Sequence, residues 1–167
     1  MARQPLPAYA SRMDQDETPI GYMARTRRYY RALGYANDYV WAHFSDVPFT
    51  PLTKALADLR IGLVTTAGPP GGYPRDARGL RHVWSGPIEP PPQKLSTDMA
   101  WDRETTHTDD RASYLPIEAA SGLARLAQRF HGVPTEYSQR KTLDEDAPEV
   151  LARLRDDGAQ AAILVPL

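Results

Sequence analysis

The sequence predicts an α/β protein: a single-domain sandwich with a mostly parallel sheet and an N-terminal helical arm. In the second half of the chain, helical patterns alternate with short apolar runs, which is the order of parallel strands joined by crossover helices. The last run, residues 161–167, is apolar throughout and follows a helical pattern, as a parallel strand buried on both faces does. We therefore expect a flexible arm over residues 1–15 and one α/β domain over residues 16–167.

The composition is that of an ordinary globular protein and argues against several functional classes. A chain of 167 residues with 41% hydrophobic and 25% charged residues can form one hydrophobic core. The formal net charge of −1 gives no reason to expect a nucleic-acid or anionic-membrane partner. Cysteine is absent, which excludes disulfides, thiolate metal sites and a cysteine nucleophile within these residues. We also expect no cofactor. Because no apolar run could span a bilayer and the first residues lack a secretory signal, we expect a cytoplasmic protein.

The first third of the chain is expected to be mainly helical. Thr18 is placed to cap a helix whose first residue is Pro19, and Gly34 follows its last turn. The aromatic and apolar residues of 37–44 indicate a second, short helix. Residues 47–52 must be extended, because each of their prolines disfavours the α conformation of the residue before it.

The first strand of the sheet is expected at residues 60–66, an apolar run that ends in two hydroxyl side chains. The following loop, residues 67–74, is rich in glycine and proline, but its spacing does not match a nucleotide-binding loop. Short strands are expected at residues 83–84 and 98–101, with an extended proline stretch at residues 90–92 between them.

Helix and strand then alternate to the end of the chain. Residues 116–128 carry apolar side chains at helical spacing, and residues 129–133 form the next candidate strand. Asp146 and Glu149 have the spacing of a capping box, with Asp146 as the N-cap of a helix that Gly158 ends. The buried stripe of this helix is expected to be Val150, Leu151 and Leu154.

Two histidines are candidates for chemistry. His107 lies among hydroxyls and carboxylates, where it could act as a general acid or base, or bind a metal together with Asp109. The alternative is a polar loop whose side chains bond to the local backbone. His131, between Phe130 and Gly132, could be functional or could be a hydrogen-bonded packing residue. The sequence contains neither a Gly-x-Ser-x-Gly elbow nor a His-Glu-x-x-His motif, which argues against serine hydrolases and zincins.

Thr65 and Thr66 end the first predicted strand. The carboxyl ends of parallel strands line the crevice in which open α/β sheets bind ligands. These hydroxyls could therefore bind a carboxylate or phosphate of a ligand, or they could simply terminate the strand.

Several pieces of the chain occur in the order found in one family of reductases: residues 29–35, 47–54, 61–68, 106–108, 129–135 and 147–149, the last leading to 162–166. In these pieces the sequence resembles the selenoprotein B family of the glycine, sarcosine, betaine and D-proline reductases, particularly its short homologues in aerobic bacteria. Residues 69–93 show no such resemblance.

The resemblance implies a reductase subunit that cleaves a small amino acid or amine with the help of a partner protein. In the family, the strand that resembles residues 161–167 is followed by a selenocysteine or cysteine, the nucleophile, which this sequence does not contain. We expect either that the reading frame closes at a UGA codon there or that the chain is cut at that point. The resemblance also implies that His107 and His131 position or protonate the substrate, and that a polar crevice holds it. The residues expected to bind substrate are Thr65, Thr66, Asp109 and Gly132.

Two other functions stay open. A non-catalytic binding or assembly protein could keep the fold without the nucleophile. A metal-dependent enzyme could use His107, Asp109 and His131. Because residues 163–167 would leave one apolar face poorly covered, we also expect a homo-oligomer or a partner chain over this region.

Overall fold

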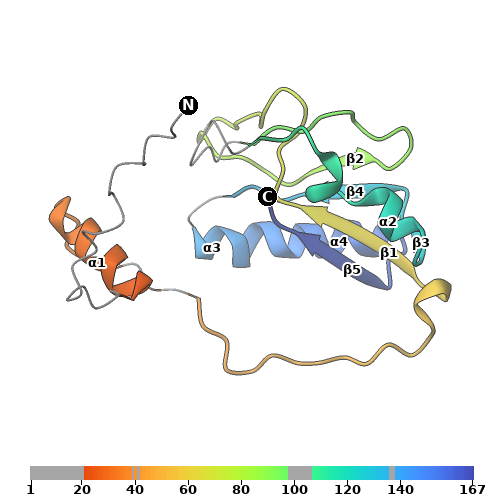
Figure 1. Ribbon diagram of the computed structural model, residues 1–167, viewed down its shortest axis with the longest axis horizontal. Helices are drawn as coiled ribbons and strands as arrows, with labels where there is room; N and C mark the ends of the chain where they lie inside the picture. Colours follow the sequence, from red (N-terminus) through yellow and green to blue (C-terminus); the bar gives the residue numbers. More distant parts are fainter. Residues whose placement is uncertain (1–20, 39, 41, 98–106, 136–137) are drawn as a thin grey trace, which may run out of the picture. The chain divides into compact units, whose positions relative to one another are not determined.

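The computed structural model describes residues 21–38, 40, 42–97, 107–135 and 138–167 (Figure 1). Its contacts divide the chain into two compact units, Met1–Asp46 and Val47–Leu167. The predicted arm boundary at residue 15, the predicted cap at Thr18 and the predicted strand at residues 98–101 lie outside the described residues.

The second unit contains a five-stranded, mostly parallel sheet, which confirms the predicted α/β class. Its strands are β1 (Arg60–Thr65), β2 (Trp84–Pro87), β3 (Arg125–Leu126), β4 (Arg129–Gly132) and β5 (Ala161–Val165). The central strand β1 pairs in parallel with β3 and β4 along one edge and with β5 along the other. β2 extends the sheet by pairing antiparallel with β4.

Helices of the second unit cover the two faces of its sheet (Figure 1). The helices are α1 (Tyr22–Ala32) in the first unit, and α2 (Ile117–Ser121), α3 (Gln139–Lys141) and α4 (Ala147–Asp156) in the second, with a π-helical turn at Thr142–Asp146. α2 packs on one face in a buried cluster with Leu63 and Phe130. α4 covers the other face, where Val150 packs with Val64. Gly62 permits this close approach, because a β-carbon there would overlap the Leu154 side chain.

The helix predicted over residues 116–128 is wrong in its second half. α2 ends at Ser121, and β3 follows almost at once. The reason is tertiary: the backbone N–H of Ala127 donates to the carbonyl of Ile61 at 2.8 Å, so this segment joins the sheet instead of continuing the helix. The predicted strand after it is confirmed as β4.

The predicted capping box at Asp146 is also wrong. Asp146 has helical backbone angles, φ −71° and ψ −44°, and its side chain makes no cap hydrogen bond. Its carboxylate instead accepts a hydrogen bond of 2.6 Å from the buried ammonium of Lys141. α3, the π-helical turn and α4 therefore follow one another without a break, and the helix does not begin at residue 147.

Three smaller expectations also fail. The described residues of 37–44 are not helical, and the Asp38 carboxylate instead accepts two hydrogen bonds from Arg31 of α1. Leu151, expected in the buried stripe of α4, is 47% exposed. β5 is parallel as predicted, but it is not buried on both faces, because Leu164 is 72% exposed. Among the described strands, β5 pairs only with β1, so it forms one edge of the sheet.

Candidate functional site

The carboxyl ends of three parallel strands meet at one edge of the sheet. Thr65 of β1 is in register with Gly132 of β4 on one side and with Val165 of β5 on the other. The segments that follow these strands, including Thr66, therefore start side by side. This carboxyl edge is the place where open α/β sheets bind their ligands.

The two threonines at this edge differ in what they can offer a ligand. Thr65 is 1% exposed, and its hydroxyl oxygen accepts a hydrogen bond of 3.1 Å from the backbone N–H of Ala67. Thr65 therefore stabilises the turn after β1. Thr66 is half-buried, and its hydroxyl oxygen accepts a hydrogen bond of 2.7 Å from the backbone N–H of Leu167. The hydroxyl hydrogen of Thr66 remains able to donate to a ligand carboxylate.

Gly132 provides room for an aromatic side chain that the sequence did not single out. A β-carbon at Gly132 would overlap the indole of Trp84. That indole packs edge-on against Phe130, with ring centroids 5.3 Å apart, and its Nε1–H donates to the carbonyl of Ala67 at 3.2 Å. Trp84 thus ties β2 to the turn that follows β1.

His107 and Asp109 lie together in an exposed loop. The backbone N–H of Asp109 donates to His107 Nδ1 at 3.4 Å, and Lys94 donates a short hydrogen bond to the Asp109 carboxylate. This hydrogen bond from Lys94 lowers the pKa of Asp109. Ser96, two residues after Lys94, exchanges two backbone hydrogen bonds of 2.8 and 3.1 Å with Gly68. These bonds join the segment that carries Lys94 to the turn after β1, at the carboxyl edge. Among the described residues, no hydrogen bond or ion pair joins His107 to the predicted site residues outside its loop, which are Thr65, Thr66, His131 and Gly132.

His131 lies elsewhere, between the sheet and α4. It is fully buried, and its Nδ1 lies 2.9 Å from the hydroxyl oxygen of Ser85 on β2. Its Nε2 lies 3.2 Å from Asp157 Oδ2 at the end of α4, an ion-pair contact without good hydrogen-bond geometry. Burial lowers the pKa of His131 below its ordinary value of 6.5, although the Asp157 charge acts in the opposite direction.

Two arginines complete this group, which we call the His131 cluster: Ser85, Arg129, His131, Arg153 and Asp157. Arg129 donates to the Asp157 carboxylate from Nε at 3.0 Å and from Nη2 at 2.7 Å. Arg153 donates from Nη1 to the Ser85 hydroxyl oxygen at 2.9 Å. The cluster therefore joins β2, β4 and α4 through charged side chains. Sequence reasoning named only His131, because the other four belong to no recognisable motif.

The metal site considered for His107, Asp109 and His131 is not formed. Within the described residues, no three His, Cys, Asp or Glu side chains are close enough together to hold a metal ion. His107 and Asp109 lie in the exposed loop, whereas His131 is enclosed by Ser85 and Asp157.

A buried ion pair was also missed. The side chains of Lys141 and Asp146 are 6% and 3% exposed, and Nζ lies 2.6 Å from Oδ1. In a regular α-helix, residues five apart do not share a face, so sequence spacing gives no hint of this pair. The π-helical turn between the two residues brings them together.

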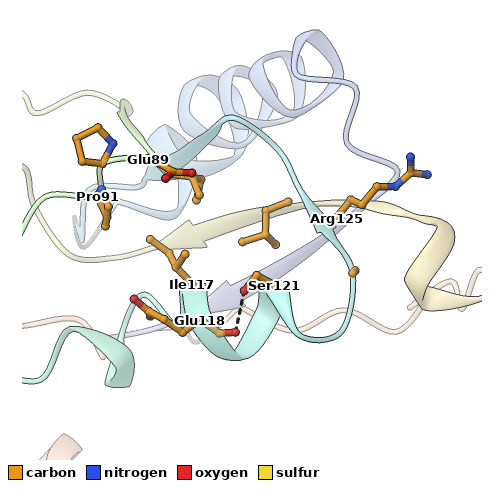
Figure 2. Close-up of a pocket in the computed structure, with 10 residues that line it drawn as sticks. Glu89, Pro91, Ile117, Glu118, Ser121 and Arg125 are labelled. Atoms are coloured by element: carbon orange, nitrogen blue, oxygen red, sulfur yellow. Dashed lines mark hydrogen bonds between the residues drawn. The ribbon is translucent and has the colours of Figure 1, made fainter.

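A pocket of about 640 Å³ lies beside α2 and β3 (Figure 2). It is away from the carboxyl edge, because β3 pairs with the first two residues of β1. Its walls are mainly apolar, and two of its charged side chains have partners: Glu118 accepts a hydrogen bond from Arg111, and Arg125 donates to the carbonyl of Asp58. Figure 2 also shows the Ser121 hydroxyl bonded to the carbonyl of Glu118. None of the residues predicted to bind substrate lines this pocket.

Comparisons with protein-family models, curated proteins and solved structures found no match. In the described part of the chain, no helix has the length and apolar character needed to cross a membrane.

Proposed function

We propose that this chain is a reductase subunit of the selenoprotein B type, which binds a small amino acid or amine for reductive cleavage. The observation that carries the proposal is the register of β4, β1 and β5. These three strands carry three of the pieces that resemble the family, and their carboxyl ends meet at one edge. In the family the nucleophile follows the strand that resembles β5, so it belongs to the same edge as Thr66 and Gly132.

Thr66 at this edge, and the exposed loop of His107 and Asp109 that Lys94 connects to it, carry groups that suit a small zwitterionic or cationic substrate. The Thr66 hydroxyl can donate to a substrate carboxylate, and the Asp109 carboxylate can attract an ammonium group. His107 is exposed, so a substrate can reach its imidazole. His131 is fully buried, so in this proposal it positions β4 and does not touch the substrate.

The chemical step needs a group from outside this sequence. This sequence contains no cysteine, and the resemblance implies that the nucleophile is the selenol or thiol of the family's motif and that a partner protein completes the reduction. The cytoplasm suits this chemistry, because it keeps thiols reduced. The described residues then supply the scaffold and the substrate crevice.

Nuclear magnetic resonance of the isotope-labelled chain tests the proposal. Glycine, sarcosine, betaine and D-proline are titrated separately, and backbone amide shifts are followed. We expect one of these ligands to give saturable shifts at Thr66, Gly132 and Asp109, and none at Ser121, which lines the separate pocket. Absence of saturable shifts at the carboxyl edge with all four ligands would contradict the proposal.

A second function, as a binding or assembly protein, is favoured by the exposed edge of the sheet. β5 presents Leu164, which is 72% exposed, and Leu151 of α4 is 47% exposed. Among the described strands, β5 has a partner along one edge only, and exposed apolar side chains beside such an edge favour association with another chain. We propose a homo-oligomer formed through β5, an arrangement that is compatible with the reductase function.

A further inference from the structure

In the His131 cluster, a hydroxyl contacts an imidazole, and the imidazole contacts a carboxylate. Ser85 Oγ lies 2.9 Å from His131 Nδ1, and His131 Nε2 lies 3.2 Å from Asp157 Oδ2. We propose that Ser85 is an activated nucleophile that reacts with carboxylic esters, with His131 as its general base and Asp157 as the residue that positions the imidazole. The Gly-x-Ser-x-Gly elbow, whose absence from the sequence argues against serine hydrolases, is not needed here, because Ser85 lies within strand β2 and meets His131 through the fold. This activity is independent of the proposed reductase function, which uses the carboxyl edge of the sheet.

The hydrogen bonds around Ser85 indicate the direction of proton transfer. The guanidinium of Arg153 can only donate, so the Ser85 oxygen accepts its hydrogen bond of 2.9 Å. The hydroxyl hydrogen of Ser85 is then free to point at His131 Nδ1. If Nδ1 accepts, the imidazole proton is on Nε2, which lies 3.2 Å from Asp157 Oδ2 in an ion-pair contact without good hydrogen-bond geometry. This is the tautomer that a general base needs.

The base is buried, and the residue that carries the nucleophile is half-buried. His131 is fully buried, whereas Ser85 is half-buried and the Arg153 side chain is 28% exposed. Ser85 lies on β2, which pairs only with β4 among the described strands. Arg129 holds the Asp157 carboxylate with bonds of 3.0 and 2.7 Å, and so fixes the group that orients His131.

The reaction is an acyl transfer. Ser85 Oγ forms a bond to the ester carbonyl carbon while its proton moves to His131 Nδ1. The carbon–oxygen bond to the leaving group then breaks, and the alcohol leaves with that proton. Water then attacks the acyl-serine by the same steps and releases the acid. The guanidinium of Arg153, held by Glu149 at 2.7 Å, lies beside the attacking oxygen and can stabilise the charge that develops on the carbonyl oxygen.

A fluorophosphonate probe tests the nucleophile on the intact chain. Its reaction forms an oxygen–phosphorus bond, breaks the phosphorus–fluorine bond and releases fluoride and a proton. We expect one adduct by intact mass, located at Ser85 by peptide mapping, and its loss in Ser85→Ala. The matched control is Ser113→Ala, since Ser113 is an exposed serine whose hydroxyl donates to the carbonyl of Asp110, and this variant should be labelled like the wild type.

The positioning role of Asp157 needs a separate measurement. The labelling rate should rise with pH as His131 loses its proton and level off by neutral pH. Asp157→Asn, checked for folding by circular dichroism, should be labelled slower than the wild type by roughly 10²-fold at every pH of the plateau. The proposal is overturned if folded wild-type protein carries no adduct at Ser85, if Ser113 is labelled at the same rate, or if folded Asp157→Asn reacts as fast as the wild type. None of these outcomes bears on amine binding at the carboxyl edge.

Discussion

The indole of Trp84 occupies the space in which a β-carbon at Gly132 would lie. This contact joins the end of β4 to β2, and the indole N–H bonded to the carbonyl of Ala67 extends it to the turn after β1. Two residues far apart in the sequence therefore shape one end of the carboxyl edge. Glycine at position 132 is required by this packing, since its β-carbon would meet a rigid ring and not the end of a flexible side chain.

Replacing Gly132 tests this relationship. Gly132→Ala must displace Trp84 from Phe130 and break the bond to Ala67, so we expect a loss of about 1–3 kcal/mol in the free energy of unfolding. Urea denaturation measures it. Gly122→Ala is the control, because a β-carbon there meets its nearest neighbour at 3.4 Å and the change should be within about 0.5 kcal/mol. Equal stability of the two variants would contradict the packing role of Gly132.

The buried pair of Lys141 and Asp146 should be costly to break. Lys141→Met leaves a buried carboxylate without its cation, and we expect a loss of about 3–5 kcal/mol in unfolding free energy. The double variant Lys141→Met, Asp146→Leu removes both charges and should recover much of that loss. Lys94→Met, which removes the exposed partner of Asp109, should have a much smaller effect. A similar loss in the single and double variants would show that packing, and not charge, holds the π-helical turn.

His131 should make stability depend on pH. Its pKa in the folded protein is lowered below 6.5, chiefly by burial, although Asp157 opposes this and Arg129 and Arg153 add to it. In the range between the folded and unfolded pKa, the unfolded chain binds more protons, so stability rises with pH. His131 therefore contributes full stability above about pH 6.5, and this contribution is lost as the pH falls through the folded pKa. The free energy of unfolding, measured between about pH 7 and about pH 5, should show this loss. Folded His131→Gln should lack the part of the pH dependence that His131 contributes.

The exposed edge of the sheet predicts self-association. Light scattering should give a mass above that of one chain, and Leu164→Asp should shift it to the monomer without loss of fold, because Leu164 is exposed. The matched control is Leu123→Asp, an exposed leucine near α2 that should leave the oligomer intact. A wild-type chain that is monomeric at all concentrations would contradict an interface at β5.

The strands that form the centre of the sheet were predictable, because short apolar runs between helical segments are typical of strands in an α/β chain. β1, β4 and β5 were all expected, but the sequence did not predict that Thr65 is in register with Gly132. The segment around β3 was not, because its apolar spacing fits a helix equally well and pairing with β1 decides its conformation.

The side chains of the site were harder to predict. Asp146 fits a capping box by its spacing, and only the burial of Lys141 in the fold reveals its true partner. Ser85, Arg153 and Asp157 reach His131 from β2 and α4 without any local motif. Such groups are set by how layers pack, which a single sequence does not display.

Calorimetric titration of small amines is the most direct test of the proposed function. Glycine, sarcosine, betaine and D-proline are titrated into the wild-type chain, into Thr66→Val and into the control Thr142→Val, whose hydroxyl donates within its own helix to the carbonyl of Ser138. We predict saturable binding of at least one ligand to the wild type and to Thr142→Val, and a weaker affinity in Thr66→Val. Absence of binding to the wild type, or equal binding to both threonine variants, would contradict a substrate site at the carboxyl edge.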